Sequence, residues 1–135
     1  MICLVDSSAW VHSLRRSGSS KVQELIRPLI TNAEAAITEW VILELMAGIR
    51  NSETAESLLR KMEPLPRLSF SPENWKPAWT LASHLRKKSV TAGAADCFLA
   101  TVAIAHEVPL VHCDKNFELI SRHSNLRTID WSVFV

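Results

Sequence analysis

The sequence predicts an α/β fold, in which helices alternate with the strands of a mostly parallel sheet. Two continuous apolar runs, at residues 2–5 and 108–113, are typical of buried parallel strands. Shorter candidate strands lie at 35–37 and 127–129, and segments with a helical spacing of apolar residues separate the four. Because the 135 residues contain neither a repeat nor a linker, we expect a single domain spanning residues 1–135.

The composition excludes several classes of protein. A net charge of +1 rules out strong overall attraction to nucleic acid, and no apolar run is long enough to cross a membrane. The N-terminus lacks the basic region of a signal peptide, and the three cysteines lie apart in apolar segments, which indicates reduced thiols in a cytoplasmic protein. Local basic clusters form either a rim for an anionic ligand or solvated helix ends. They comprise Arg15, Arg16, Lys21, Arg86, Lys87 and Lys88.

Seven helices are expected between and after the strands. Their ranges are 9–14, 21–30, 39–49, 52–62, 71–88, 93–106 and 117–120. Pro28 predicts a kink or a break in the second helix, because proline lacks the N–H that a helix interior needs. Trp75 and Trp79 lie one turn apart above smaller alanines. We interpret this stripe as core, with a partner-binding groove as the alternative.

Four acidic residues interrupt apolar segments. Asp6 and Asp114 each follow an apolar strand, while Glu44 and Asp96 lie inside apolar helices. Moving a lone carboxylate into an apolar interior costs on the order of several kcal/mol, so we expect a cation, a metal ion or N–H donors beside each of them. Two alternatives remain open: Asp6 as the N-cap of the helix that follows it, and Glu44 as a hydrogen-bonded core carboxylate.

The predicted topology brings these four carboxylates together. Strand carboxyl ends and the helices that follow them share one edge of a parallel sheet, where ligands bind. Clustered carboxylates raise one another's pKa unless a counter-charge is present, and ligation by oxygen alone favours Mg²⁺ or Mn²⁺. Such ions activate water and neutralise a phosphodiester, so the pattern predicts metal-dependent phosphodiester hydrolysis. A zinc site at His112 and Cys113 is the weaker alternative, because no second ligand pair has the required spacing.

Four motifs carry a resemblance to a known family. In chain order they are Val5-Asp6-Ser7-Ser8, Leu43-Glu44-Leu45-Met46-Ala47-Gly48, Ala95-Asp96-Cys97-Phe98-Leu99-Ala100-Thr101-Val102-Ala103 and Cys113-Asp114-Lys115-Asn116-Phe117. Their order and spacing resemble those of PIN-domain proteins, specifically the VapC-type toxins of prokaryotic toxin–antitoxin pairs. The match covers nearly the whole chain.

The resemblance implies a fold, an activity and partners. The fold is a three-layer α/β/α sandwich with a parallel sheet of four or five strands, and the activity is that of a Mg²⁺- or Mn²⁺-dependent endoribonuclease acting on RNA. The partners are a second copy of the chain, in a homodimer, and a cognate antitoxin that blocks the site, often with a basic side chain. Carried over by position, the metal-binding and catalytic set consists of Asp6, Glu44, Asp96 and Asp114.

Two further positions are auxiliary in this resemblance. Ser8 matches a hydroxyl that supports the first aspartate, and Asn116 stands where many relatives have another aspartate. Asparagine still offers a carbonyl oxygen but carries no charge, so the resemblance implies weaker binding of a second metal ion.

Two other functions are compatible with parts of the pattern. A catalytically silent PIN-like module would bind RNA or a protein without cutting; Asn116 and the near-neutral net charge favour it, whereas the four intact acids oppose it. A receiver-like phospho-acceptor domain also gathers aspartates at strand ends, but Glu44 and Asp96 within helices fit that class poorly. A metal-dependent ribonuclease is therefore the leading hypothesis.

Overall fold

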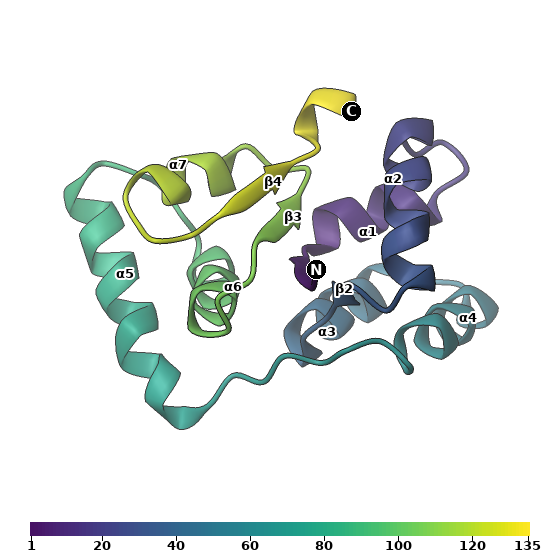
Figure 1. Ribbon diagram of the computed structural model, residues 1–135, viewed down its shortest axis with the longest axis horizontal. Helices are drawn as coiled ribbons and strands as arrows, with labels where there is room; N and C mark the ends of the chain where they lie inside the picture. The colour runs from purple at the N-terminus through teal and green to yellow at the C-terminus, as the bar shows by residue number, and fades with distance from the viewer.

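A four-stranded sheet forms the centre of the computed structural model, which describes residues 1–135 (Figure 1). The strands are β1 (Cys3–Val5), β2 (Ala35–Ala36), β3 (Leu110–His112) and β4 (Thr128–Asp130). Their order across the sheet is β2-β1-β3-β4, and every neighbouring pair is parallel. All four carboxyl ends therefore lie at one edge of the sheet, as the sequence predicts.

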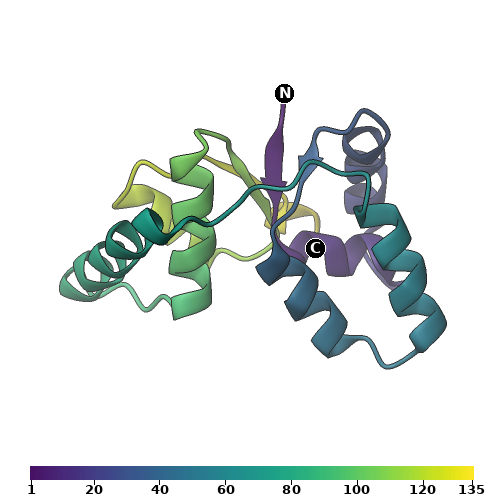
Figure 2. The ribbon, with the colours of Figure 1, turned by 90° about the horizontal axis from the view of Figure 1, so that it is seen from below.

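Seven α-helices surround the sheet. They are α1 (Ser7–Leu14), α2 (Ser20–Thr31), α3 (Glu39–Gly48), α4 (Ser52–Met62), α5 (Trp75–Lys87), α6 (Ala94–Ala105) and α7 (Asn116–Arg122), with short 3-10 turns at Pro72–Asn74 and Ser132–Phe134. The helices α1 to α4 lie on one side of β1, and α5 and α6 lie on the other (Figure 2). This arrangement confirms the predicted three-layer α/β/α fold. None of the helices is long and apolar enough to span a membrane.

The hydrophobic core lies on both faces of the sheet. The side chains of β1 and β3 are buried throughout, and they join one contiguous cluster of apolar residues. Trp10 of α1 and Phe117 of α7 are the largest fully buried side chains, and Leu99 brings α6 into the same cluster. Burial of each such side chain contributes about 1.5–3 kcal/mol to the free energy of unfolding.

Pro28 does not break α2, so that part of the sequence prediction is wrong. The helix continues to Thr31, and the N–H of Asn32 donates to the Pro28 carbonyl over 2.9 Å. A proline removes the N–H that would bond to the carbonyl four residues earlier, here that of Glu24. Both Glu24 and Pro28 are exposed, so the Glu24 carbonyl and the Pro28 ring face solvent, and the helix tolerates the missing hydrogen bond.

Polar side chains cap the starts of the first four helices. The caps are Asp6 for α1, Ser19 for α2, Thr38 for α3 and Asn51 for α4, and each accepts a hydrogen bond from a backbone N–H two or three residues later. A cap of this kind contributes about 1 kcal/mol. The N-cap alternative for Asp6 is therefore confirmed, and Thr38 fixes the start of the helix that carries Glu44.

Three helices end on a residue in the left-handed region of backbone space, although none of these residues is a glycine. Ala33 (φ 53°), Ser89 (φ 58°) and Glu107 (φ 54°) follow α2, α5 and α6. In each case the next residue donates its N–H to a carbonyl five residues back in the helix, such as Glu34 to Leu29 (2.8 Å). The bonds are those of a Schellman motif, whose usual residue at this position is glycine.

The tryptophan stripe of α5 is not core, which corrects the interpretation made from sequence. Trp75 is 53% exposed and Trp79 is 63% exposed, whereas Ala78 is only 7% exposed. The helix packs against α6 and buries Ala78 and Leu85, while the exposed Trp75 ring lies beside the Phe98 ring. Together with Trp40 of α3 they line a wholly apolar groove of about 380 Å³, which agrees with the alternative of a partner-binding groove.

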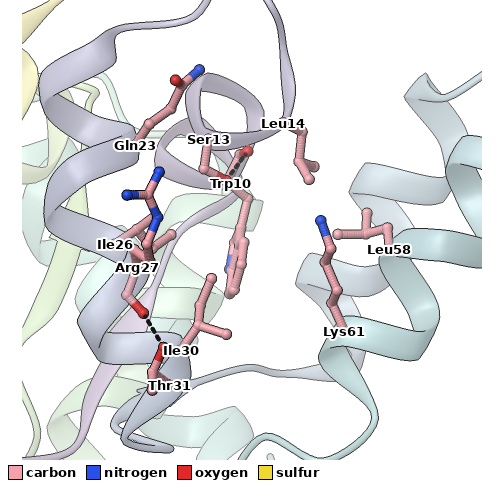
Figure 3. A pocket seen from close by; sticks show the side chains of 10 residues that line it. All are labelled: Trp10, Ser13, Leu14, Gln23, Ile26, Arg27, Ile30, Thr31, Leu58 and Lys61. Atoms are coloured by element: carbon pink, nitrogen blue, oxygen red, sulfur yellow. Dashed lines mark hydrogen bonds between the residues drawn. The ribbon is translucent and has the colours of Figure 1, made fainter.

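A cavity of about 350 Å³ lies between α1, α2 and α4, with the Trp10 ring on its wall (Figure 3). The indole Nε1 of Trp10 is buried and has no hydrogen-bond partner. Arg27 of α2 and Lys61 of α4 stand on opposite sides of the cavity. A buried N–H without an acceptor is uncommon, because it forfeits the hydrogen bond that water would supply.

Replacing Ala33 with glycine is expected to raise the free energy of unfolding by about 1 kcal/mol, because an L side chain is disfavoured at φ 53°. Urea denaturation of the purified variant measures the change. Ala55→Gly, inside α4, is the matched control and should lower stability by about 1 kcal/mol. A loss of stability in Ala33→Gly would contradict the assigned backbone conformation.

Candidate active site

The topology gathers the four predicted acids at the carboxyl edge of the sheet. Asp6 and Asp114 follow the neighbouring strands β1 and β3, Asp96 lies in the first turn of α6, and Glu44 lies within α3. The charges of the other three all act on Asp96 and contribute to raising its pKa. All four predicted residues are thus brought together.

Asp6 is the most buried of the four, with 6% of its surface exposed. Its Oδ2 accepts hydrogen bonds from the Ser8 N–H (3.0 Å) and from the Ser8 hydroxyl (2.5 Å). Burial raises the pKa of Asp6 even though these two bonds favour its charged form. The fold therefore holds this carboxylate in place at a cost in solvation.

The Ser8 hydroxyl connects two of the four motifs. While it donates to Asp6, it accepts a hydrogen bond from the Cys113 N–H over 2.9 Å. The carboxylate at the end of β1 is thereby tied to the turn that carries Asp114 at the end of β3. This contact supports the auxiliary role predicted for Ser8.

His112 positions Asp114, a role that the sequence interpretation missed. The Asp114 N–H donates to His112 Nδ1 over 3.2 Å, and His112 Nε2 lies 2.7 Å from Glu118 Oε2. Because Nδ1 accepts, Nε2 carries the hydrogen and donates a hydrogen bond to Glu118 Oε2. The ring is fully buried and both its nitrogens are engaged, which argues against the zinc alternative. The sequence feature that could have indicated this role is a polar residue inside an otherwise apolar strand.

Glu44 lies on the exposed surface of α3, so its predicted apolar, core-like setting is wrong. The apolar face that it shares with Trp40 and Leu43 is only partly covered: Trp40 contacts the Phe98 ring of α6, whereas Leu43 is 60% exposed. The Ser7 hydroxyl donates to Glu44 Oε1 over 3.3 Å, a contact that the sequence interpretation also missed. Partial burial, followed by the nearby Asp6, raises the pKa of Glu44.

Asn116 contributes its backbone to the site. Its N–H donates to Asp114 Oδ1 over 3.0 Å, and its side chain is exposed. Since any residue except proline has this N–H, the contact does not depend on asparagine. The auxiliary role predicted for its amide oxygen stays a prediction.

The four carboxylates lack a cationic partner. None of the ion pairs in the structure includes Asp6, Glu44, Asp96 or Asp114. Burial, followed by the charges of Asp114, Asp6 and Glu44, raises the pKa of Asp96 to about 6. Carboxylate oxygens without a counter-charge have the chemistry that Mg²⁺ or Mn²⁺ requires. No three histidine, cysteine or acidic side chains are close enough to enclose a metal ion, so the carboxylates would have to move closer together to bind one.

Comparison with known proteins agrees with this arrangement. A family model of the PIN domain matches residues 3–122, which include all four acids. The chain belongs to the PIN-domain family. This PIN domain is 32% identical over 127 residues to VapC ribonuclease Mb1587 of Mycobacterium bovis and, equally, to ribonuclease VapC11 of Mycobacterium tuberculosis. The alignments cover 92% of the chain and 95% of each relative.

Solved structures support the same fold. VapBC2 from Rickettsia felis, bound to a DNA fragment from its promoter, superposes on this PIN domain with a TM-score of 0.79 at 25% identity. The superposition covers 97% of this chain and 99% of the Rickettsia felis chain. DNA-bound VapBC from Salmonella typhimurium gives a TM-score of 0.77 at 15% identity, with 97% and 99% coverage. Membership of this family also removes the receiver-like alternative.

Asp96→Asn is expected to stabilise the metal-free protein at pH 7 by about 1 kcal/mol, after allowance for solvent screening of a partly exposed group. The pKa of Asp96 is about 6 in the folded protein and 3.8 in an unperturbed chain, so the folded state binds more protons between these values. Wild-type stability therefore falls as the pH rises from about 4 to 6, and the variant lacks this loss.

Urea denaturation in EDTA at several pH values from 4 to 7 tests this expectation. The difference between variant and wild type should vanish toward the acid end. A variant that is less stable than wild type at pH 7 would show that the carboxylate makes a favourable contact that the cluster does not explain.

Proposed function

We propose that the chain is a Mg²⁺- or Mn²⁺-dependent endoribonuclease that hydrolyses RNA phosphodiester bonds. The observation that carries this proposal is the group of four carboxylates without a cation, placed at the carboxyl edge of a PIN-domain sheet. The similarity to VapC ribonuclease Mb1587 and to ribonuclease VapC11 supports the reaction class.

In this proposal Asp6, Glu44, Asp96 and Asp114 hold the metal. A bound divalent ion supplies an activated water and neutralises charge that develops on the phosphodiester. The remaining residues maintain the positions of these acids. Ser8 holds the Asp6 carboxylate, His112 and the Asn116 N–H hold the Asp114 turn, and Ser7 hydrogen-bonds to Glu44. Because the pKa of Asp96 is about 6, its carboxyl group is ionised in most molecules at pH 7.

Cleavage of a mixed RNA pool by the purified protein tests the proposed activity. We expect cutting with Mn²⁺ or Mg²⁺, none with EDTA, and a loss of at least about 100-fold in Asp96→Asn. Glu56→Gln, an exposed acid on α4, is the matched control and should cut like wild type. A folded protein whose melting temperature rises with Mn²⁺ but which cuts no RNA would be the silent module instead.

We further propose that the chain acts in the cytoplasm as the toxin of a toxin–antitoxin pair. Three unpaired cysteines suit a reducing compartment. The similarity to VapBC2 of Rickettsia felis supports an antitoxin partner, and unneutralised carboxylates at the site suit a basic side chain of that partner.

The homodimer is proposed to form through the apolar groove between α3, α5 and α6. Trp79 lines this groove and is 63% exposed. Trp79→Glu is therefore expected to weaken self-association at least ~30-fold, the usual effect of replacing a tryptophan at the centre of an interface. Sedimentation velocity over a concentration series measures it. Leu59→Glu, which places the same charge on an exposed leucine of α4, is the control. A wild-type protein that stays monomeric throughout would contradict the dimer.

A further inference from the structure

A groove of about 320 Å³ leads away from the candidate active site between α1, α3 and the start of α4. Ser7 and Glu44, which hydrogen-bond to each other, line the end of the groove that adjoins the four acids. Arg15, the residue that follows α1, lines it as well. Since α1 has eight residues, Arg15 lies about 12 Å along the helix from Ser7.

The lining combines apolar walls with a single cation. Val11 and Leu14 of α1 face Leu45 and Ile49 of the α3 segment, and all four are at least partly buried. Arg15 is exposed and forms no ion pair, so its guanidinium is available to an anion. The volume is at the lower end of the range for small-molecule sites, ~300–1,000 Å³.

We propose that this groove holds the nucleotide next to the scissile phosphate of a single-stranded RNA, with its base against the apolar walls and a flanking phosphate at Arg15. This inference rests on the proposed nuclease function, because it is the four acids that define where the scissile phosphate lies. A base is planar and largely apolar on its faces, and each nucleotide carries one negative charge, which is the combination that the groove accommodates.

The charge of Arg15 suits a ligand that carries a phosphate in this groove. An RNA backbone that approaches four carboxylates is repelled by them, so it needs a cation near the entrance. Arg15 meets this requirement, and Arg16 adds a second exposed cation in the same segment. The sequence analysis left open whether these arginines form a rim or only a solvated helix end; the groove supports the rim for Arg15.

Gly48 makes the proposal testable without damage to the fold. It ends α3, lines the groove, and a Cβ added there would meet no atom within 4 Å. Gly48→Leu therefore adds a side chain at the groove lining, and its Cβ displaces no protein atom. Leucine also has a better helix propensity than glycine, so the variant is expected to fold.

The experiment measures binding of a short, mixed-sequence single-stranded RNA in EDTA by fluorescence anisotropy, where no cleavage interferes. We expect Gly48→Leu to weaken binding severalfold, because the leucine occupies space at the aliphatic walls that the base would fill. Arg15→Ala should weaken it severalfold and make the slope of log Kd against log salt shallower by about 0.7, the signature of one lost phosphate contact.

Two control variants lie at the opposite edge of the sheet. Ala105→Leu adds the same side chain at the C-terminal end of α6, and Arg127→Ala removes an exposed arginine just before β4. Both should bind RNA like wild type. If Gly48→Leu and Arg15→Ala also bind like wild type, or if they alter only binding to an antitoxin, the inference is wrong.

Cleavage assays separate this inference from the proposed function. If RNA is cut but both groove variants keep the wild-type Kd and KM, the nuclease stands and the nucleotide site fails. If no RNA is cut but both variants bind it more weakly than the controls, the groove is an RNA site and the nuclease proposal fails. With an active enzyme, the variants should raise KM and change kcat by less than about twofold, because the groove binds a part of the substrate that does not react.

Discussion

The parallel pairing of β1 with β3 is the constraint on which the candidate site depends. Val5 pairs with Val111, so the two strands end side by side and place Asp6 and Asp114 at the same edge of the sheet. The helices α1, α6 and α7 begin near these acids, and the positive ends of helices favour carboxylates. Backbone dipoles and hydrogen bonds from serine therefore replace a basic residue in holding together charges that repel one another. This repulsion destabilises the metal-free folded protein, and a cation that binds there would relieve it.

Much of the fold follows from short-range patterns that the sequence displays directly. The apolar runs became β1 and β3, and Thr38 and Asp6 became helix caps. Such features depend on neighbours within one or two turns, so a single sequence contains the information. The positions of the four acids were also predictable, because they follow from strand order and from the motifs themselves.

Features that depend on what covers a surface could not be predicted in the same way. Periodicity shows that Trp40 and Glu44 share a face of α3, and that Trp75 and Trp79 share a face of α5, but it does not show that both faces stay largely exposed. The contact between Ser7 and Glu44 joins residues 37 positions apart, and no local pattern marks it. The ends of α2, α5 and α6 were predicted to within one residue, whereas their left-handed residues were not, because alanine, serine and glutamate occupy positions where glycine is usual.

The short strands have a consequence for how this protein can associate with itself. The edge strands β2 and β4 have only two and three residues, and the extended segment around Arg67 already pairs with Ile37 beside β2. Long unpaired edges are templates on which sheets of different molecules join and aggregate. This sheet offers almost none, so the chain can expose aromatic side chains for assembly while its backbone remains protected against uncontrolled strand addition.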